Sequence, residues 1–174
     1  LPWARLAGPL ELDGMVDEPA WDAVEPVPMT VFQPTFGGTP TERTEIRIAY
    51  EDKYLWVSGR MYDSNPSGVR ANTLYRDRYS GDDLLSILID SFNDYETALW
   101  FSITPSGALT DHSVLNDGES TNFINWNWST FWEGKARKTD DGWSAEMRIP
   151  LSSLGFQDDD GHVQMGMTVY RLIA

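Results

Sequence analysis

Short runs of alternating apolar and polar residues, separated by turn residues, are the feature that most constrains the fold of this chain. The run TEIRIAYE (44–51) places Ile46, Ile48 and Tyr50 on one side and Glu45 and Arg47 on the other. This period of two residues is typical of a half-buried β-strand. Similar signals predict strands within residues 52–63, 83–92, 96–107, 108–115, 131–150 and 163–173.

Turn residues join these runs into antiparallel neighbours. Pro-Ser-Gly (105–107) separates two runs, and Asp-Asp-Gly (140–142) divides the stretch 131–150 into a hairpin. Helical signals are confined to residues 17–24 and 150–154. The sequence therefore predicts an all-β fold, a two-sheet antiparallel β-sandwich of immunoglobulin or jelly-roll type with one or two short helical turns. Residues 32–43 are expected to form a long loop before the main sheet.

The composition fits one domain over residues 1–174. Hydrophobic residues make up 41% and aromatic residues 13% of the chain, which is enough to bury a core without disulfides. The net charge of −14 repels phosphate backbones, so nucleic acid is not expected as a partner. The absence of cysteine excludes disulfides, thiolate metal sites and cysteine nucleophiles.

Two further features concern the boundaries of the chain. No apolar run approaches the roughly 20 residues that a transmembrane helix needs. The sequence begins at Leu1, and Ala174 follows directly after a strand-like run. We therefore expect a longer parent protein, with any targeting segment outside these residues.

Hydrolytic chemistry has no recognisable centre in the sequence. His112 and His162 are the only histidines, and no Gly-x-Ser-x-Gly elbow is present. The many carboxylates do not single out one pair of the kind that hydrolyses glycosides. The chain is therefore not expected to be an enzyme, and a glycoside hydrolase is the least favoured function.

The tryptophan-rich stretch NFINWNWSTFWEG (122–134) has two interpretations. Trp126, Trp128 and Trp132 lie beside Asn125 and Asn127, and indole next to amide groups is typical of a surface that stacks on and hydrogen-bonds to sugar rings. The same stretch also suits a sandwich core, because residues 126 and 128 would share one face of a strand. The residues alone leave both interpretations open.

Several motifs carry a resemblance to a known family. The segment LELDGMVDEPAWDAVEPV (10–27) resembles the opening of carbohydrate-binding module family nine-like domains, in which a strand precedes an Asp-Gly-x-x-Asp-Glu-x-x-Trp motif. Residues 41–68, 76–111, 128–156 and the last strand continue the resemblance in order and spacing. It implies a β-sandwich, export from the cytoplasm and carbohydrate binding.

A narrower resemblance concerns the protein context. The chain is similar to N-terminal domains of bacterial proteins that continue into a region expected to form an outer-membrane β-barrel. This implies the periplasm, the outer membrane or the cell surface, with the C-terminal remainder of the same chain as a partner. Because such modules accompany glycosidases, the resemblance also implies an association with carbohydrate catabolism.

The resemblance assigns roles to individual tryptophans. Trp128 and Trp132, together with Trp21 and Trp143, fall in scaffold motifs and are expected to be structural. Trp126 falls outside these motifs and is expected to be exposed.

Characterised members hold the end of a saccharide between two tryptophans, with polar residues on neighbouring strands. Here Tyr79 or Ser80 stands near the place of the first tryptophan, while Ser86 and about Ser102 replace a glutamate and an arginine. The second tryptophan would lie beyond the end of the chain. We therefore predict a relocated sugar site, in which Trp126, Tyr79 and Tyr75 stack on the ligand and Asn125, Asn127, Asp82 and Arg76 form hydrogen bonds.

A calcium site is a separate prediction. Asp90, Asn93 and Asp94 cluster at the end of a predicted strand, where oxygen ligands suit a hard cation. The acidic charge and the ion sites of the resembled family support calcium, which we place at Asp90 and Asp94.

Three functions follow in order of preference. The first is a non-catalytic carbohydrate-binding module of an exported bacterial envelope protein. The alternative is a docking or scaffold domain that packs on its own C-terminal barrel or on a protein partner without binding sugar. The last is a glycoside hydrolase.

Overall fold

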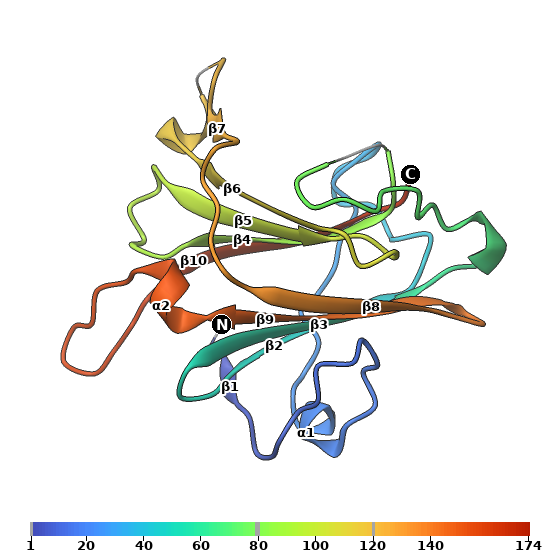
Figure 1. The fold of residues 1–174 in the computed structure, drawn as a ribbon, viewed down its shortest axis with the longest axis horizontal. Coiled ribbons are helices and arrows are strands. Elements are labelled where there is room, and N and C mark those ends of the chain that lie inside the picture. Colours follow the sequence, from blue (N-terminus) through green and yellow to red (C-terminus); the bar gives the residue numbers. More distant parts are fainter. Residues whose placement is uncertain (1, 79–80, 120) are drawn as a thin grey trace.

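The computed structural model describes residues 2–78, 81–119 and 121–174, and it shows two five-stranded sheets packed face to face (Figure 1). The first sheet has the order β1 (Ala4–Arg5), β2 (Thr44–Tyr50), β3 (Tyr54–Tyr62), β9 (Gly142–Pro150) and β8 (Glu133–Thr139). The second has the order β10 (Gly166–Leu172), β4 (Leu84–Asp90), β5 (Ala98–Ile103), β6 (Leu109–Val114) and β7 (Ile124–Asn125). The helical turns are α1 (Pro19–Asp22), α2 (Leu151–Leu154), η1 (Pro66–Gly68) and η2 (Asn116–Gly118). The predicted β-sandwich is confirmed.

The inner faces of the two sheets form the core. Ile46 and Val57 from the first sheet meet Leu85, Ile87 and Phe101 from the second, and all five are fully buried. Burial of each such side chain stabilises the fold by about 1.5–3 kcal/mol. The alternation seen in the sequence is therefore the alternation between this core and the two outer faces.

One glycine sets the distance between the sheets. A Cβ atom on Gly59 of β3 would lie 2.6 Å from the Cδ2 atom of Leu85 on β4. This separation is well inside van der Waals contact, so a larger side chain would force the sheets apart. The absence of a side chain at Gly59 is therefore what allows the close packing at this point.

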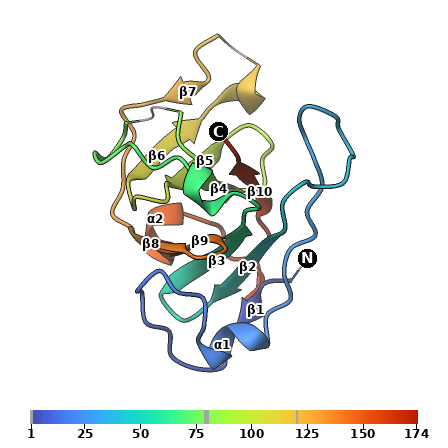
Figure 2. The ribbon, with the colours of Figure 1, turned by 90° about the vertical axis from the view of Figure 1, so that its right-hand side faces the viewer.

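The N-terminal segment covers the outer face of the first sheet. Trp21 and Val24 pack there on Ala49 and Trp56, and form a second, smaller core. Figures 1 and 2 show α1 beneath this sheet, at the opposite end of the molecule from β7. The outer face of the second sheet thus lies far from the N-terminal segment.

Three short segments differ from the sequence-based expectation. Strands β1 and β7 were not predicted, because two residues are too few to show a period, and β1 pairs with β2 in parallel. Residues 10–12 form no strand, and Leu10 and Leu12 instead pack against the second core. The loop at 32–43 is confirmed, since no strand or helix occurs there.

Candidate functional site

A row of aromatic rings crosses the outer face of the second sheet. Phe101 and Ile103 of β5 point into the core, so Trp100 between Leu99 and Phe101 points outward. Trp100 lies opposite His112 of β6 in the strand register, which places His112 on the same outer face. The sheet therefore presents an indole and an imidazole side by side.

Two more rings extend this pair towards the two edges of the sheet. The ring centroids of Trp126 and His112 are 4.8 Å apart, and those of His112 and Trp100 are 4.5 Å apart. On the other side, Trp100 meets Tyr170 of β10 at 5.9 Å. We call Trp126, His112, Trp100 and Tyr170 the aromatic row.

A small residue makes the last of these contacts possible. Ser86 of β4 lies opposite Tyr170 in the register and is fully buried, and it hydrogen-bonds Ser102 at 2.7 Å. A large side chain at position 86 would stand between the rings of Tyr170 and Trp100. The small side chain of Ser86 therefore lets the row continue across β4.

His112 is the buried centre of the row. His112 is only 3% exposed, and within the described chain neither nitrogen of its ring has a hydrogen-bond partner. Burial lowers the pKa of His112, against the opposing attraction of Asp111 and Asp77. The lowered pKa favours the neutral imidazole, which packs between the two indoles and supports them from below rather than facing solvent.

An open hollow of about 390 Å³ adjoins the row on the same outer face. Its floor includes Leu88 and Ala98, which lie beside Trp100 on the sheet, and Val114, two residues from His112. Its full lining is Leu88, Asp90, Tyr95, Glu96, Thr97, Ala98, Val114, Asp117, Gly166, Met167 and Thr168. Apolar floor and polar rim together resemble a binding surface.

Trp126 has the exposure that was predicted for it. Its side chain is 65% exposed, whereas Trp132 is 3% exposed and packs on Phe101 with Trp128. Strand β7 ends at Asn125 and a turn follows at 126–127, so the alternation of faces is broken there. Trp126 and Trp128 therefore point to different sides, and the stretch serves both the surface and the core. Trp21 and Trp143 are buried, as expected of structural residues.

The two asparagines flank Trp126 in this turn. The Asn125 side-chain oxygen accepts a hydrogen bond from the backbone N–H of Asn127 at 3.1 Å. Asn125 thus fixes the turn that presents Trp126, and Asn127 is exposed beside it. Both residues lie next to the aromatic row.

The other predicted ligand residues that the structure describes lie at 70–78 and 81–83, between η1 and β4. Tyr75 is 77% exposed, and Arg76 pairs with buried Asp111 and donates to the carbonyl of Thr130 at 3.1 Å. These contacts join the loop to the segment that carries Trp132. Their sugar-binding role stays a prediction.

Asp82 is fully buried. Its carboxylate accepts hydrogen bonds from the backbone N–H groups of Asn72 and Thr73 at 2.9 and 2.6 Å. These bonds and the Asn72 side chain keep the Asp82 pKa below its usual value, although burial, the largest effect, opposes them. Asp82 thus holds the loop from inside rather than facing solvent. Tyr79 lies outside the described residues.

Asp90 and Asp94 build a turn. The Asp90 carboxylate accepts from the backbone N–H groups of Asp94 and Tyr95 at 3.1 and 2.9 Å, and Asp94 accepts from those of Glu96 and Thr97 at 2.8 Å. Within residues 2–78, 81–119 and 121–174, no three acidic or histidine side chains converge in a way that could hold a metal ion. The two carboxylates are engaged by the backbone of their own turn, and calcium at Asp90 and Asp94 stays a prediction.

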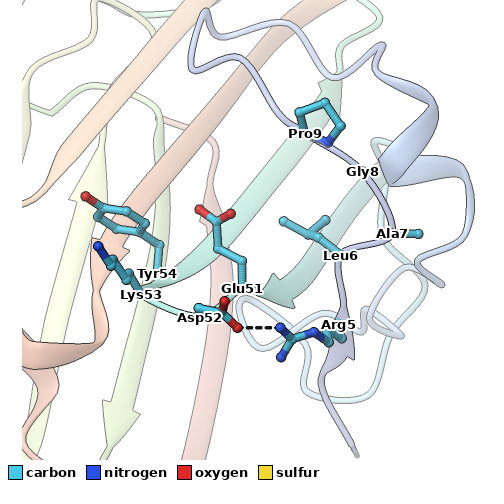
Figure 3. Close-up of a pocket in the computed structure, with 9 residues that line it drawn as sticks. All are labelled: Arg5, Leu6, Ala7, Gly8, Pro9, Glu51, Asp52, Lys53 and Tyr54. Carbon is cyan, nitrogen blue, oxygen red and sulfur yellow. Dashed lines mark hydrogen bonds and ion pairs between the residues drawn. The ribbon is translucent and has the colours of Figure 1, made fainter.

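A second open hollow, of about 510 Å³, lies on the other sheet. Residues 5–9 and the turn at 51–54 line it, and Figure 3 shows the ion pair between Arg5 and Asp52 at its side. Both partners of that pair are largely exposed, so the pair contributes little stability. Tyr54 is the one aromatic residue among the described residues that line it, and the hollow lies on the opposite sheet from the aromatic row.

Comparison with known proteins identifies the family of this chain. The family model described as "Carbohydrate family 9 binding domain-like" matches residues 12–171, nearly the whole chain. The chain belongs to this family. No curated protein matches the sequence significantly.

Two solved family 9 modules share the fold. One module from Caldicellulosiruptor kristjanssonii, in complex with glucose, has a TM-score of 0.63 and 18% identity over 95% of this chain and 74% of that chain. Another from the same organism, in complex with cellotriose, has a TM-score of 0.57 and 16% identity over 96% of this chain and 82% of that chain. At this identity the likeness establishes the β-sandwich.

Sequence reasoning found one end of the aromatic row and missed the rest. Trp100, His112 and Tyr170 come from three strands, and only the register of β10, β4, β5 and β6 brings them together. The available signal was the outward position of each ring within its own strand. Which strands are neighbours was not readable from that signal.

Proposed function

We propose that this domain is a non-catalytic carbohydrate-binding module that binds its ligand on the aromatic row. The observation that carries the proposal is the row itself, which ends in the exposed indole of Trp126. Flat C–H faces of sugar rings stack on such indoles, and the flanking amides of Asn125 and Asn127 can hydrogen-bond hydroxyl groups. Family membership and the sugar complexes of two solved family members support the same function.

The experiment is a glycan array with the domain and its Trp126→Ala variant. Specific signals that disappear in the variant support the proposal. The matched control is Phe36→Ala, which removes a ring that is 79% exposed on the loop at 32–43, outside the aromatic row, and should leave the signals unchanged. Equal signals from all three proteins would contradict the placement of the site.

We further propose that the domain works outside the cytoplasm as part of a bacterial envelope protein. The support is the resemblance to N-terminal domains of such proteins. In the described chain no helix is long and apolar enough to cross a bilayer. Fractionation of cells that express the natural protein tests the location, and recovery only in the cytosolic fraction would contradict it.

A second candidate function is docking on the remainder of the same chain or on a protein partner. Phe32 and Phe36 favour it, because they are 73% and 79% exposed and pack on each other at 6.3 Å. The loop that carries them projects beside the sandwich (Figure 2). Hydrogen exchange of residues 28–41 in the full-length protein and in the isolated domain tests this function, since docking slows exchange only in the former.

A further inference from the structure

We propose that the ligand of the aromatic row is an internal stretch of a neutral, non-crystalline glycan chain. This inference rests on the proposed function and specifies its ligand. It differs from the recognition of a saccharide end that the resemblance implies. Three features of the outer face carry it: the open ends of the row, the angles between its rings and the charge of the adjoining hollow.

The row is open at both ends. Tyr170 lies on β10 and Trp126 directly follows β7, and these two strands are the two edges of the sheet. Strands about 4.8 Å apart give a five-stranded sheet a width of about 19 Å. His112 is buried, so the accessible surface of the row is the exposed Trp126 and the half-buried Trp100 and Tyr170. A glycan chain that contacts these three rings spans the sheet from edge to edge and can continue past either edge.

The residues that would close one end in the resembled family are absent from this row. Serines occupy the strand positions of the family glutamate and arginine, and Ser86 and Ser102 hydrogen-bond each other at 2.7 Å. Their hydroxyl groups are buried and mutually engaged. They are therefore not available to grip the hydroxyl groups of a terminal sugar.

The rings do not form one plane. The angle between successive ring planes is 41° for Trp126 and His112, 57° for His112 and Trp100, and 70° for Trp100 and Tyr170. Binding to a crystalline polysaccharide face needs coplanar rings, because the crystal face is flat. A single hydrated chain can turn about its glycosidic bonds and follow the changing planes.

The charged side chains among the described residues that line the adjoining hollow are all negative. Asp90, Glu96 and Asp117 line it, and no lysine, arginine or histidine occurs in its lining. The net charge of the whole domain, −14, is also negative. Uronic acid or sulfated chains would be repelled at this surface, whereas an uncharged chain would not.

The first test uses cello-, xylo-, manno-, laminari- and malto-hexaose, each also in borohydride-reduced form, with calorimetry as the readout. We expect at least one hexaose to bind about tenfold or more tightly than its monosaccharide, a difference of about 1.4 kcal/mol, with reduction changing its affinity less than twofold. Loss of binding on reduction, or equal binding of the monosaccharide, would overturn the inference while leaving carbohydrate binding intact. Binding of no glycan in the array or here would overturn both.

The second test separates charge from backbone structure. If cello-hexaose is bound, the test compares hydroxyethyl cellulose with carboxymethyl cellulose, which have the same backbone but differ in charge. Affinity electrophoresis should then show retardation of the domain by the neutral polymer only. If another hexaose is bound, the neutral and oxidised forms of its own polymer are compared. The Glu96→Gln, Asp117→Asn double variant should gain binding to the anionic polymer at low salt. Stronger retardation of the wild type by the anionic polymer, or sedimentation with crystalline cellulose or chitin, would overturn the inference.

Discussion

The indole of Trp126 contacts His112 yet leaves 65% of its side-chain surface in solvent. We expect Trp126→Ala to weaken glycan binding by tenfold or more, while the free energy of unfolding changes by about 0.5 kcal/mol or less. Urea unfolding and calorimetry on the same preparation measure both quantities. A large loss of stability would show that Trp126 belongs to the core instead.

Substitution of Trp143, in contrast to Trp126, is expected to cause a large loss of stability. It is 1% exposed and packs in the main core between the sheets. Trp143→Ala should therefore destabilise the fold by about 3–5 kcal/mol. Urea unfolding measures the change, and a loss below about 1 kcal/mol would contradict the structural role.

The buried imidazole of His112 predicts a pH effect. Because its folded pKa is lowered, the unfolded chain binds the proton more readily, and stability is lost as pH falls below about 6.5. The His112→Phe variant keeps a ring there and removes the two unpartnered nitrogens. It should lose less stability than the wild type between pH 7 and pH 5, as measured by urea unfolding at both values. A greater loss in the variant would contradict the assignment.

At the scale of elements, the N-terminal segment is joined to β9 by hydrogen bonds to the carboxylate of Glu146. Glu146 is fully buried and accepts from the Trp21 indole N–H and from the backbone N–H of Gly14, both at 3.1 Å. Burial raises the pKa of Glu146 to about 7, helped by the nearby charge of Glu18 and opposed by these hydrogen bonds.

This raised pKa predicts a slope opposite to that of His112. A carboxyl group whose folded pKa exceeds its unfolded pKa stabilises the fold fully below about 4.5, and this stability is lost as pH rises through 7. The loss should be on the order of 1–3 kcal/mol. Urea unfolding of wild type and Glu146→Gln at pH 5 and pH 7.5 isolates the effect, because only the wild type should show this part of the slope. Equal slopes would contradict it.

The long strands were predictable from sequence and the short ones were not. In β2 the core residues Ile46 and Ile48 stand two positions apart, whereas β4 is buried on both faces from Leu84 to Ile87, so an alternating run predicted the first strand and a continuous apolar run the second. Strand β7 ends at Asn125, and the side into which the following Trp128 points is decided by its tertiary contact with Phe101. A contact between distant strands leaves no period in the sequence, which is also why the aromatic row could not be predicted.

At the scale of the whole molecule, calcium can be tested by its effect on stability. The carboxylates of Asp90 and Asp94 are already engaged with backbone N–H groups of their own turn. If calcium binds at Asp90 and Asp94 as predicted, a chelator should lower the melting temperature, because a ligand bound to the folded state raises it. A rise with calcium that is lost in Asp94→Asn would establish the site, and an unchanged melting temperature would contradict it.

In the proposed account, one outer face of the sandwich serves the structure and the other binds the ligand. The N-terminal segment covers one face through Trp21, and the other face bears the aromatic row. The glycan array with wild type and the Trp126→Ala variant tests this division most directly. Specific signals that disappear in the variant, with unchanged folding, are the predicted result. A blank array from the folded wild type, or signals that survive in the variant, would contradict it.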